Sequence, residues 1–485
     1  MMDPVEYATC DGLGLAALVE RGEVSVAETA TAALAACDIV DGQLGAVVEV
    51  YEEAPHRTSA DLGDGPFRGV PFLIKDMGPH FGGLKLEFGS RLCEGYTPDA
   101  DDFFARLVKE SGVTLVGRSN TPEFSMALCA DNLLYGATSN PWRAGYSTSG
   151  SSGGAAAAVA AGIVPVAHGS DLGGSIRGPA AWCGTVGLQP SRARVSCGPA
   201  VAESGNGMSQ NFALTRSVRD TAAMLDCLGR PQAGDPFVIP RPERPYLDYV
   251  SGLRERRRIA WSTAPLMDAP VDPEVAAAVE RVAGVLQELG HEVVEEAPDI
   301  DLPALDRALF EVWYFRFDKR LDELAASVGR AVGPETVGLA TLRFYEFARR
   351  QDPERFYAAL DALNSARRAF GPFFAEYDVW LSPTCAQVAQ PNGVYGMDVD
   401  LPPEEFLQHE QRPCQYMVVY NMAGAPAISL PLAQHSGGLP IGVQLGAGPA
   451  REHVLIGLAG ELEEALPWAG RVPPLHVSRL RGATA

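Results

Sequence analysis

Apolar residues recur in the first part of the chain at spacings typical of helices and strands. Ser25 followed by Glu28 is a capping-box pattern, which predicts a helix that opens there and continues through Cys37. Residues 101–111 have the apolar spacing of an amphipathic helix, and they lead into the strand-like run VTLVG at 113–117. The pattern therefore predicts both helices and strands in this part of the chain.

The remaining segments differ in composition as well as in period. Residues 155–161 carry the smallest side chains, which predicts a helix that can pack closely against a sheet. Proline and glycine accumulate over 229–244, as expected of a connector. Residues 273–289 and 301–368 have largely helical patterns. The strand-like run DVWLSPT at 378–384 then returns the chain to the core.

Charge and cysteine content narrow the class of protein. The 485 residues include 39 Lys and Arg against 61 Asp and Glu, a formal net charge of −22. Nucleic acids and anionic membranes select basic surfaces, so neither is expected as a partner. The nine cysteines are scattered, with no CxxC pair. They indicate reduced core residues in the cytoplasm, not disulfides or a zinc site.

Neither a membrane span nor a targeting segment is expected. The longest apolar run, at 155–167, has 13 residues and contains Gly162 and Pro165. About 20 residues are needed to span a bilayer as a helix. The N-terminal residues include Asp3 and Glu6 and lack the basic start and apolar core of a signal peptide. A cytoplasmic location is therefore expected.

Two glycine-rich serine sites carry the candidate chemistry. Ser151 and Ser152 lie in SGSSGG, and Ser175 lies 24 residues after Ser151 in GSDLGGSIRGPA. Gly173 and Gly174 allow a tight turn that directs several N–H groups to one point, as an oxyanion requires. Gly and Ser are also the commonest turn residues, so this motif alone is more typical of an ordinary loop.

A base for such a serine is harder to find among the histidines. The GSSGG sequence does not have the Gly-x-Ser-x-Gly spacing of a nucleophile elbow. His168, in the apolar run IVPVAHGS, is more typical of a packed strand residue. Lys75 ends the apolar run VPFLI and is followed by Asp76. A lysine there either extends its amine to solvent or is held inside for a purpose, and the pattern leaves both open.

Several blocks together resemble the amidase signature family. The resemblance rests on Lys75, Ser151 and Ser175 with GSDLGGSIRGPAAWCGTVGLQPS, and on GRSNTPEFS, YGATSNPW, YNMAGAPAISLP and GLPIGVQL. These blocks span about residues 66–445, and their combination is far more specific than any one of them. VAHGSD, LTRSVRDTAAMLD and LEEALPW are also similar to the aminohexanoate cyclic dimer hydrolases, a subgroup that acts on nylon oligomers.

The resemblance implies an α/β fold with a large mixed, twisted sheet covered by helices on both faces. It implies one amidase domain over 1–485, in which the mainly helical segment at about 230–375 borders the substrate pocket. Members hydrolyse amides with a Ser-cisSer-Lys triad, here Ser175, Ser151 and Lys75, with the Gly150–Ser151 peptide bond in cis. The implied oxyanion hole consists of the N–H groups of Leu172, Gly173, Gly174 and Ser175.

Other residues are assigned supporting or substrate-binding roles. Ser152 is expected to support Ser151 by a hydrogen bond. Asp171 and Arg177, six residues apart, are expected to clamp the turn as an ion pair. Ser125 and Met126 match the family block that lines the pocket near the carbonyl. The aromatic run Trp313, Tyr314, Phe315 and Phe317 can wall the leaving-group side, although such a run is more often core.

The sequence thus predicts an amide hydrolase that acts on a small or oligomeric amide, with carbamates and esters as further candidates. A glutaminase subunit of an amidotransferase complex and a non-catalytic binding module are the alternatives. No ligand-spaced cluster of His, Cys, Asp or Glu, no GxxxxGK[ST] and no strand-linked GxGxxG occurs, so no metal or other cofactor is expected. A homodimer is a further possibility that the sequence leaves open.

Overall fold

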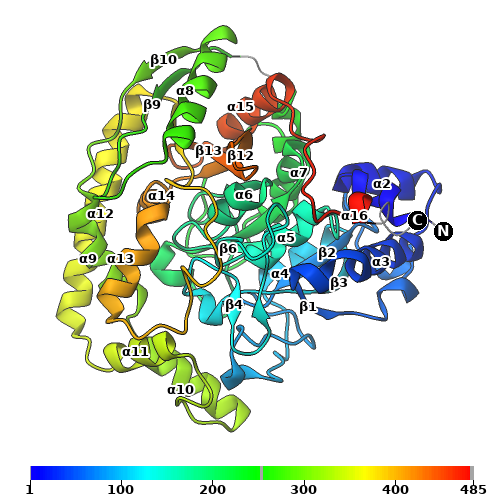
Figure 1. The fold of residues 1–485 in the computed structure, drawn as a ribbon, viewed down its shortest axis with the longest axis horizontal. Helices are drawn as coiled ribbons and strands as arrows, with labels where there is room; N and C mark the ends of the chain where they lie inside the picture. Colours follow the sequence, from blue (N-terminus) through cyan, green and yellow to red (C-terminus); the bar gives the residue numbers. More distant parts are fainter. Residues whose placement is uncertain (1, 252–254, 481–485) are drawn as a thin grey trace.

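The computed structural model describes residues 2–251 and 255–480. Within them, eleven strands form one mixed sheet and two short strands form a separate antiparallel pair (Figure 1). Across the large sheet the strand order is β1-β3-β2-β6-β8-β7-β12-β13-β11-β9-β10. The strands are β1 (Val47–Val50), β2 (Pro71–Lys75), β3 (Thr114–Ser119), β4 (Asp131–Asn132), β5 (Gly136–Ala137), β6 (Val166–Asp171), β7 (Val186–Gln189), β8 (Gln210–Thr215), β9 (Arg258–Trp261), β10 (Glu292–Glu295), β11 (Val379–Pro383), β12 (Ala427–Gln434) and β13 (Pro440–Ala447).

Helices flank this sheet, which confirms the predicted fold class (Figure 1). They are α1 (Pro4–Thr9), α2 (Gly12–Glu20), α3 (Val26–Leu44), α4 (Phe103–Glu110), α5 (Gly153–Ala161), α6 (Arg177–Cys183), α7 (Val218–Leu228), α8 (Pro273–Glu288), α9 (Leu302–Trp313), α10 (Phe317–Val328), α11 (Leu339–Ala348), α12 (Pro353–Glu376), α13 (Pro403–Cys414), α14 (Val418–Ala423), α15 (Glu452–Ala465) and α16 (Val477–Leu480).

The N-terminal capping signal has the expected structural effect. Ser25 is the N-cap of α3, and both hydrogen bonds of the capping box with Glu28 are present. The helix continues past Cys37 to Leu44, where Gly45 ends it in the left-handed conformation at φ 62°. Thus the expected start is confirmed, and the helix is longer than expected because its glycine stop lies further along the chain.

The long helical pattern of the second half is divided. Residues 301–368 are largely helical, but they form α9, α10, α11 and most of α12. Arg316 and Gly329, at φ 62° and 67°, turn the chain before and after α10. The sequence also did not predict β9 and β10, which lie before this segment and of which β9 pairs in parallel with β11 as well as with β10. Both strands have only four residues, too few for a clear alternating pattern.

The order of the central strands brings the ends of two strands that are distant in the sequence to one edge of the sheet. Strand β2 runs parallel to β3 on one side and to β6 on the other. Parallel neighbours end at the same edge, so Lys75 at the end of β2 and Asp171 at the end of β6 lie at a common edge. The candidate site is built there.

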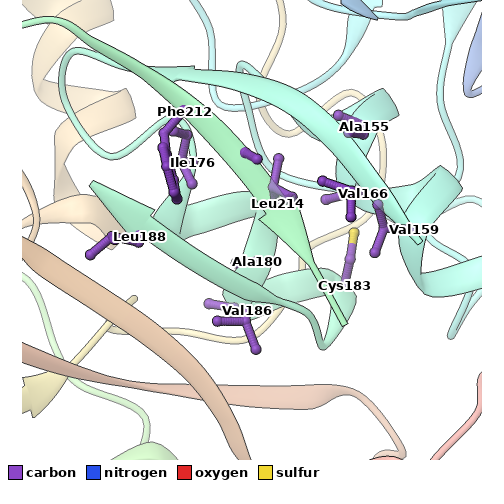
Figure 2. Close-up of a cluster of buried hydrophobic side chains, with 14 of the residues drawn as sticks. Ala155, Val159, Val166, Ile176, Ala180, Cys183, Val186, Leu188, Phe212 and Leu214 are labelled. Carbon is purple, nitrogen blue, oxygen red and sulfur yellow. The ribbon is translucent and has the colours of Figure 1, made fainter. Parts of the chain in front are cut away.

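A buried apolar cluster fixes the two helices that follow the serine loops. Side chains of α5 and α6 meet those of β6, β7 and β8 in one part of the core (Figure 2). All but one of the residues of α5 are fully buried glycine, alanine or valine, so the helix approaches the sheet closely, as the sequence indicated. The labelled members are Ala155, Val159, Val166, Ile176, Ala180, Cys183, Val186, Leu188, Phe212 and Leu214.

Candidate active site

Lys75 is the centre of a buried hydrogen-bond cluster. Its side chain is enclosed, with 2% of the residue exposed, so the amine does not extend to solvent. The Lys75 Nζ lies 2.6 Å from Ser151 Oγ, 2.9 Å from Ser170 Oγ and 3.1 Å from Ser152 Oγ. The structure therefore decides between the two interpretations of this lysine in favour of an enclosed amine with three hydroxyl partners.

Burial changes the proton affinity of this amine. Removal from water disfavours the ammonium form and lowers the pKa of Lys75 from 10.5 to about 7, although the charge of Asp171 acts in the opposite direction. A lysine with this pKa is neutral in a large fraction of molecules near neutral pH. A neutral amine has a lone pair, so it can accept a proton from Ser151.

The loop before α5 presents two serines that have different partners. The Gly150–Ser151 peptide bond is cis, as the resemblance implied. Ser152 differs from expectation: its hydroxyl contacts Lys75 and the backbone of Ser170, and not the Ser151 side chain. The Ser152 hydroxyl therefore supports the lysine, and not the neighbouring serine, while it contacts Ser170 of β6. Its N–H also donates to the Ser175 carbonyl at 3.1 Å, which joins the two serine turns.

Ser175 lies in the turn between β6 and α6. Gly174 has φ +119°, a conformation that residues with a Cβ rarely adopt. A Cβ on Gly173 would stand 2.7 Å from Trp313 Cζ2. The two glycines therefore meet a conformational and a steric requirement, and Ser175 and Ser151 line the same pocket.

Asp171 organises this turn. Its carboxylate accepts the N–H of Gly174 at 2.7 Å and that of Ile176 at 3.1 Å. The Gly174 N–H is thus already used inside the protein, whereas the sequence had assigned it to the oxyanion hole. Among the described residues, the N–H groups of Leu172, Gly173 and Ser175 have no protein acceptor. These three groups remain as candidate donors to an oxyanion.

Arg177 pairs with Asp171, as expected from their spacing. The Arg177 Nε lies 3.0 Å from Asp171 Oδ2, and both side chains are fully buried. Arg177 also donates to the Met417 carbonyl, Asn421 and Gln444, so the pair connects the turn to α14 and β13. Burial opposes ionisation of Asp171, but the arginine outweighs it and holds the pKa of Asp171 below its ordinary value. The pair has no direct place in the pocket wall.

The pocket that contains both serines has a largely apolar wall. Ser125 and Met126 line it, as the sequence predicted for substrate-binding candidates. The aromatic run divides: Trp313, Tyr314 and Phe317 line the pocket, while Phe315 stacks on Phe356 at 4.0 Å between ring centroids, in a separate core cluster. Other lining residues come from the loops after β2 and β3, from the residue before β8, from α10 and from α13; they are Met77, Phe124, Ala127, Leu128, Ser209, Arg320, Leu407, Glu410, Gln411 and Cys414.

His168 lies beside the site but is not part of the pocket wall. The residue is buried in β6, and its ring packs on Phe104 with 4.9 Å between ring centroids. Its Nδ1 accepts the backbone N–H of Lys75 at 3.2 Å. Burial, together with the charge of Lys75, lowers the pKa of His168 to about 3. This position fits the packed strand residue that the sequence indicated.

Sequence reasoning missed three residues of the site. Ser170 stands in the quoted motif GSDLGGS and contacts Lys75, and its place one residue before the end of β6 could have identified it. Glu410 and Gln411 line the pocket from α13. No local signal marks them, because their segment has the ordinary pattern of an amphipathic helix.

Comparison with known proteins identifies the family of this chain. A family model described as Amidase matches residues 28–456, most of the chain. The protein therefore belongs to the amidase signature family and is a hydrolase that acts on amide bonds.

Curated relatives and solved structures are similar over nearly the whole length. The 6-aminohexanoate-cyclic-dimer hydrolase of Paenarthrobacter ureafaciens is 35% identical over 481 residues, 96% of each chain. The acylamidase of Rhodococcus erythropolis is 31% identical and covers 95% of this chain and 96% of its own. A structure of a 6-aminohexanoate cyclic dimer hydrolase complexed with substrate has a TM-score of 0.90 at 34% identity, covering 96% of this chain and 99% of its own. The chain is thus similar to the nylon-oligomer hydrolases.

Membrane spans and metal clusters are both absent from the described residues. None of the helices there combines the length and the apolar composition needed to span a bilayer. No group of three or more His, Cys, Asp or Glu side chains in that part of the chain is placed to hold a metal ion.

Proposed function

We propose that this amidase hydrolyses a small or oligomeric uncharged amide through an acyl-enzyme intermediate. In this mechanism Ser175 is the nucleophile, Ser151 relays its proton and Lys75 is the base. The contact between Lys75 Nζ and Ser151 Oγ at 2.6 Å, inside a buried cluster, is the observation that carries the proposal. Ionisable groups with strongly shifted pKa values cluster at functional sites, which supports a catalytic role for this lysine.

The acylation step follows from these positions. The Ser175 oxygen attacks the amide carbonyl carbon, its proton passes to the Ser151 oxygen, and the Ser151 proton passes to Lys75 Nζ. The carbonyl oxygen becomes an oxyanion that the N–H groups of Leu172, Gly173 and Ser175 can stabilise. Lys75 then returns its proton through Ser151 to the leaving nitrogen, and the C–N bond breaks.

Deacylation reverses the same proton path. A water molecule attacks the ester carbonyl of the acyl-enzyme while Ser151 and Lys75 accept its proton. The proton then returns to the Ser175 oxygen as the carboxylic acid departs. Ser152 and Ser170 hold the amine in place during both steps, since each contacts Lys75 Nζ.

The triad is tested by replacement of the nucleophile. Ser175→Ala should lower kcat by several orders of magnitude and leave the unfolding temperature nearly unchanged, because the hydroxyl contributes no core packing. Ser209→Ala, at another serine that lines the pocket, is the matched control and should retain most activity. Mass spectrometry of the wild type after a rapid quench should detect the acyl adduct on the peptide that contains Ser175. A folded Ser175→Ala protein with substantial turnover would refute the assignment.

The substrate class is inferred from the pocket and the relatives. The pocket wall is mainly apolar and aromatic, which suits an uncharged substrate. Relatives named for a cyclic 6-aminohexanoate dimer and for acylamides support amides of this kind. Carbamates and esters can follow the same acyl-enzyme route. A screen of anilides, aliphatic amides, cyclic amide dimers, carbamates and esters, ranked by kcat/KM, tests this choice.

The alternatives are less well supported. A glutamyl-tRNA(Gln) amidotransferase component from Thermotoga maritima shares the fold, with a TM-score of 0.75, but at 25% identity. The 6-aminohexanoate-cyclic-dimer hydrolase is more similar, at 35%. A glutaminase assay and co-purification of partner chains would separate these functions. A binding module without catalysis is disfavoured because Lys75, Ser151 and Ser175 are all present.

Three further expectations stay as predictions: a single cooperative domain over 1–485, a homodimer and a cytoplasmic location. Calorimetric unfolding, light scattering coupled to gel filtration and cell fractionation check them in turn.

A further inference from the structure

Glu410 is a buried acid in the pocket wall, and only one of its two carboxyl oxygens has a hydrogen-bond partner among the described residues. It lies on α13 with 6% of the residue exposed. Its Oε2 accepts the backbone N–H of Leu128, whereas its Oε1 is buried and has no hydrogen-bond partner among the described residues. A buried polar atom without a partner costs free energy, so its presence at a pocket calls for a ligand that satisfies it.

Two neighbours share this property. Gln411 Oε1 and Trp313 Nε1 are also buried without a partner in the described structure, and both residues line the same pocket. The ring of Trp313 borders Gly173 of the serine turn. The three residues that carry these atoms therefore border the space that a substrate on Ser175 would fill.

The surroundings of Glu410 contain no compensating cation. The titratable groups that face it are Tyr314 directly after α9, Cys414 on α13, Cys129 in the loop before β4 and Tyr395 in the loop before α13. Arg320 lines the same pocket, but no ion pair joins Glu410 to any described basic residue. Burial raises the pKa of Glu410 to about 8, although the N–H of Leu128 acts in the opposite direction. The acid is thus mainly neutral at pH 7, and a neutral carboxyl group can donate a hydrogen bond.

We propose that Glu410 is a specificity-determining residue, which donates a hydrogen bond from its neutral carboxyl group to a second oxygen of an uncharged substrate, away from the amide that is cleaved. This inference rests on the proposed amidase function and extends it. Gln411 Oε1 adds a hydrogen-bond acceptor and Trp313 Nε1 adds a donor in residues of the same pocket. The second substrate group that fits best is therefore an amide, or another neutral group that both donates and accepts hydrogen bonds. A pocket that hydrogen-bonds such a group rejects an analogue without it, because its own polar atoms then stay unpaired.

The test compares substrates that differ only in the second polar group. One series is ω-acetamidoalkanoyl para-nitroanilides of increasing spacer length, and the matched series is n-alkanoyl para-nitroanilides with the same number of chain atoms. A reversed pair carries the acetamido group on the amine portion, with product release followed by chromatography. A third series ends in an ammonium group, which only an ionised Glu410 would favour.

The variants separate hydrogen bonding from folding. Glu410→Leu should lower kcat/KM for the best acetamido substrate by about tenfold or more and change its alkanoyl partner by less than about twofold. The loss should appear mainly in KM, since the contact lies away from the reacting atoms. Glu410→Gln keeps an N–H donor and should retain most of the preference. Glu405→Leu, on an exposed position of the same helix, should have no effect.

A second measurement needs no variant. In the wild type, the ratio of kcat/KM between acetamido and alkanoyl partners should fall above about pH 8, as Glu410 loses the proton that it donates. In Glu410→Gln this ratio should not vary with pH. Because the same triad cleaves both substrates, the effect of Lys75 titration on kcat/KM is the same for each and drops out of the ratio.

The outcomes distinguish the inference from the function on which it rests. Equal losses on both partners in Glu410→Leu, or a ratio that does not depend on pH in the wild type, would overturn the role of Glu410 while the amidase function stands. A preference for the ammonium series that Glu410→Gln abolishes would also overturn it, in favour of an ionised acid. If the wild type cleaves none of the probes, calorimetric binding of the same pairs to Ser175→Ala still reads the contribution of Glu410.

Discussion

The proton affinity of Lys75 leads to a quantitative prediction for the pH dependence of catalysis. The base must be neutral to accept the Ser151 proton, so kcat/KM for an uncharged substrate follows the neutral fraction of Lys75. With a pKa of about 7, the rate constant should rise with pH and reach a plateau above about pH 8. The difference from the ordinary value of 10.5 means that the buried site destabilises the ammonium form by roughly 5 kcal/mol relative to water.

The size of the rise distinguishes this lysine from an unperturbed one. For a pKa of about 7, the neutral fraction is about one in eleven at pH 6 and about ten in eleven at pH 8, an increase of about tenfold. An amine with the ordinary pKa would give an increase of about 100-fold over the same interval and no plateau below pH 10. The two curves differ in shape as well as in slope.

The assay is kcat/KM for a neutral anilide between pH 5.5 and 10, at constant ionic strength, with enzyme stability checked at each pH. Lys75→Ala should be severely impaired. Lys75→Arg should not recover activity, because a guanidinium group stays protonated. His168→Asn is the control: it can lose some activity through packing, but the apparent pKa should stay near 7, since His168 itself titrates near 3. An inactive His168→Asn beside an active Lys75→Ala, or a rise that continues to pH 10, would refute the reasoning.

Three further predictions concern stability and cofactors. Arg177→Met should lower the free energy of unfolding in urea by about 3–5 kcal/mol, because it leaves Asp171 charged and buried; Arg343→Met, which breaks an exposed pair, should have a much smaller effect. Gly173→Ala should reduce both activity and thermal stability, since its Cβ would stand 2.7 Å from the Trp313 ring, and Trp313→Leu in the same protein should restore part of the stability. If the double variant unfolds no later than Gly173→Ala, that steric account fails. Activity should survive dialysis against a chelator, and a loss that one specific metal ion restores would contradict the expectation of no metal.

Local sequence signals were sufficient for much of the secondary structure. The Ser25 and Glu28 capping box acts between residues three apart, and the structure contains both of its hydrogen bonds. Helix α8 and strands β2, β3, β6 and β11 occur where their patterns predicted them. The strands β9 and β10 were missed because four residues show little pattern of their own, and both strands depend on pairing with neighbours that are distant in the chain.

The candidate site was only partly predictable. The serine turns and the lysine carry recognisable motifs, so the sequence alone indicates their roles. The hydrogen-bond partner of Ser152 and the bond from the Gly174 N–H to Asp171 were not predictable. Both depend on how one side chain and one backbone N–H group are oriented in the folded turns. The division of the aromatic run depended on which face of the chain meets the pocket.

By itself, the sequence determined which residue types were available, where helices such as α3 and α8 begin, and which family motifs the chain carries. These features depend on residues close together in the chain. The tertiary structure alone decided that Lys75 reaches three serines up to 95 positions away, and that Glu410 meets Leu128 across 282 positions. Such contacts depend on strand order and helix packing, which bury a charge or leave a polar atom without a partner. Burial is what sets the pKa of Lys75 and Glu410, and hence the chemistry proposed for each.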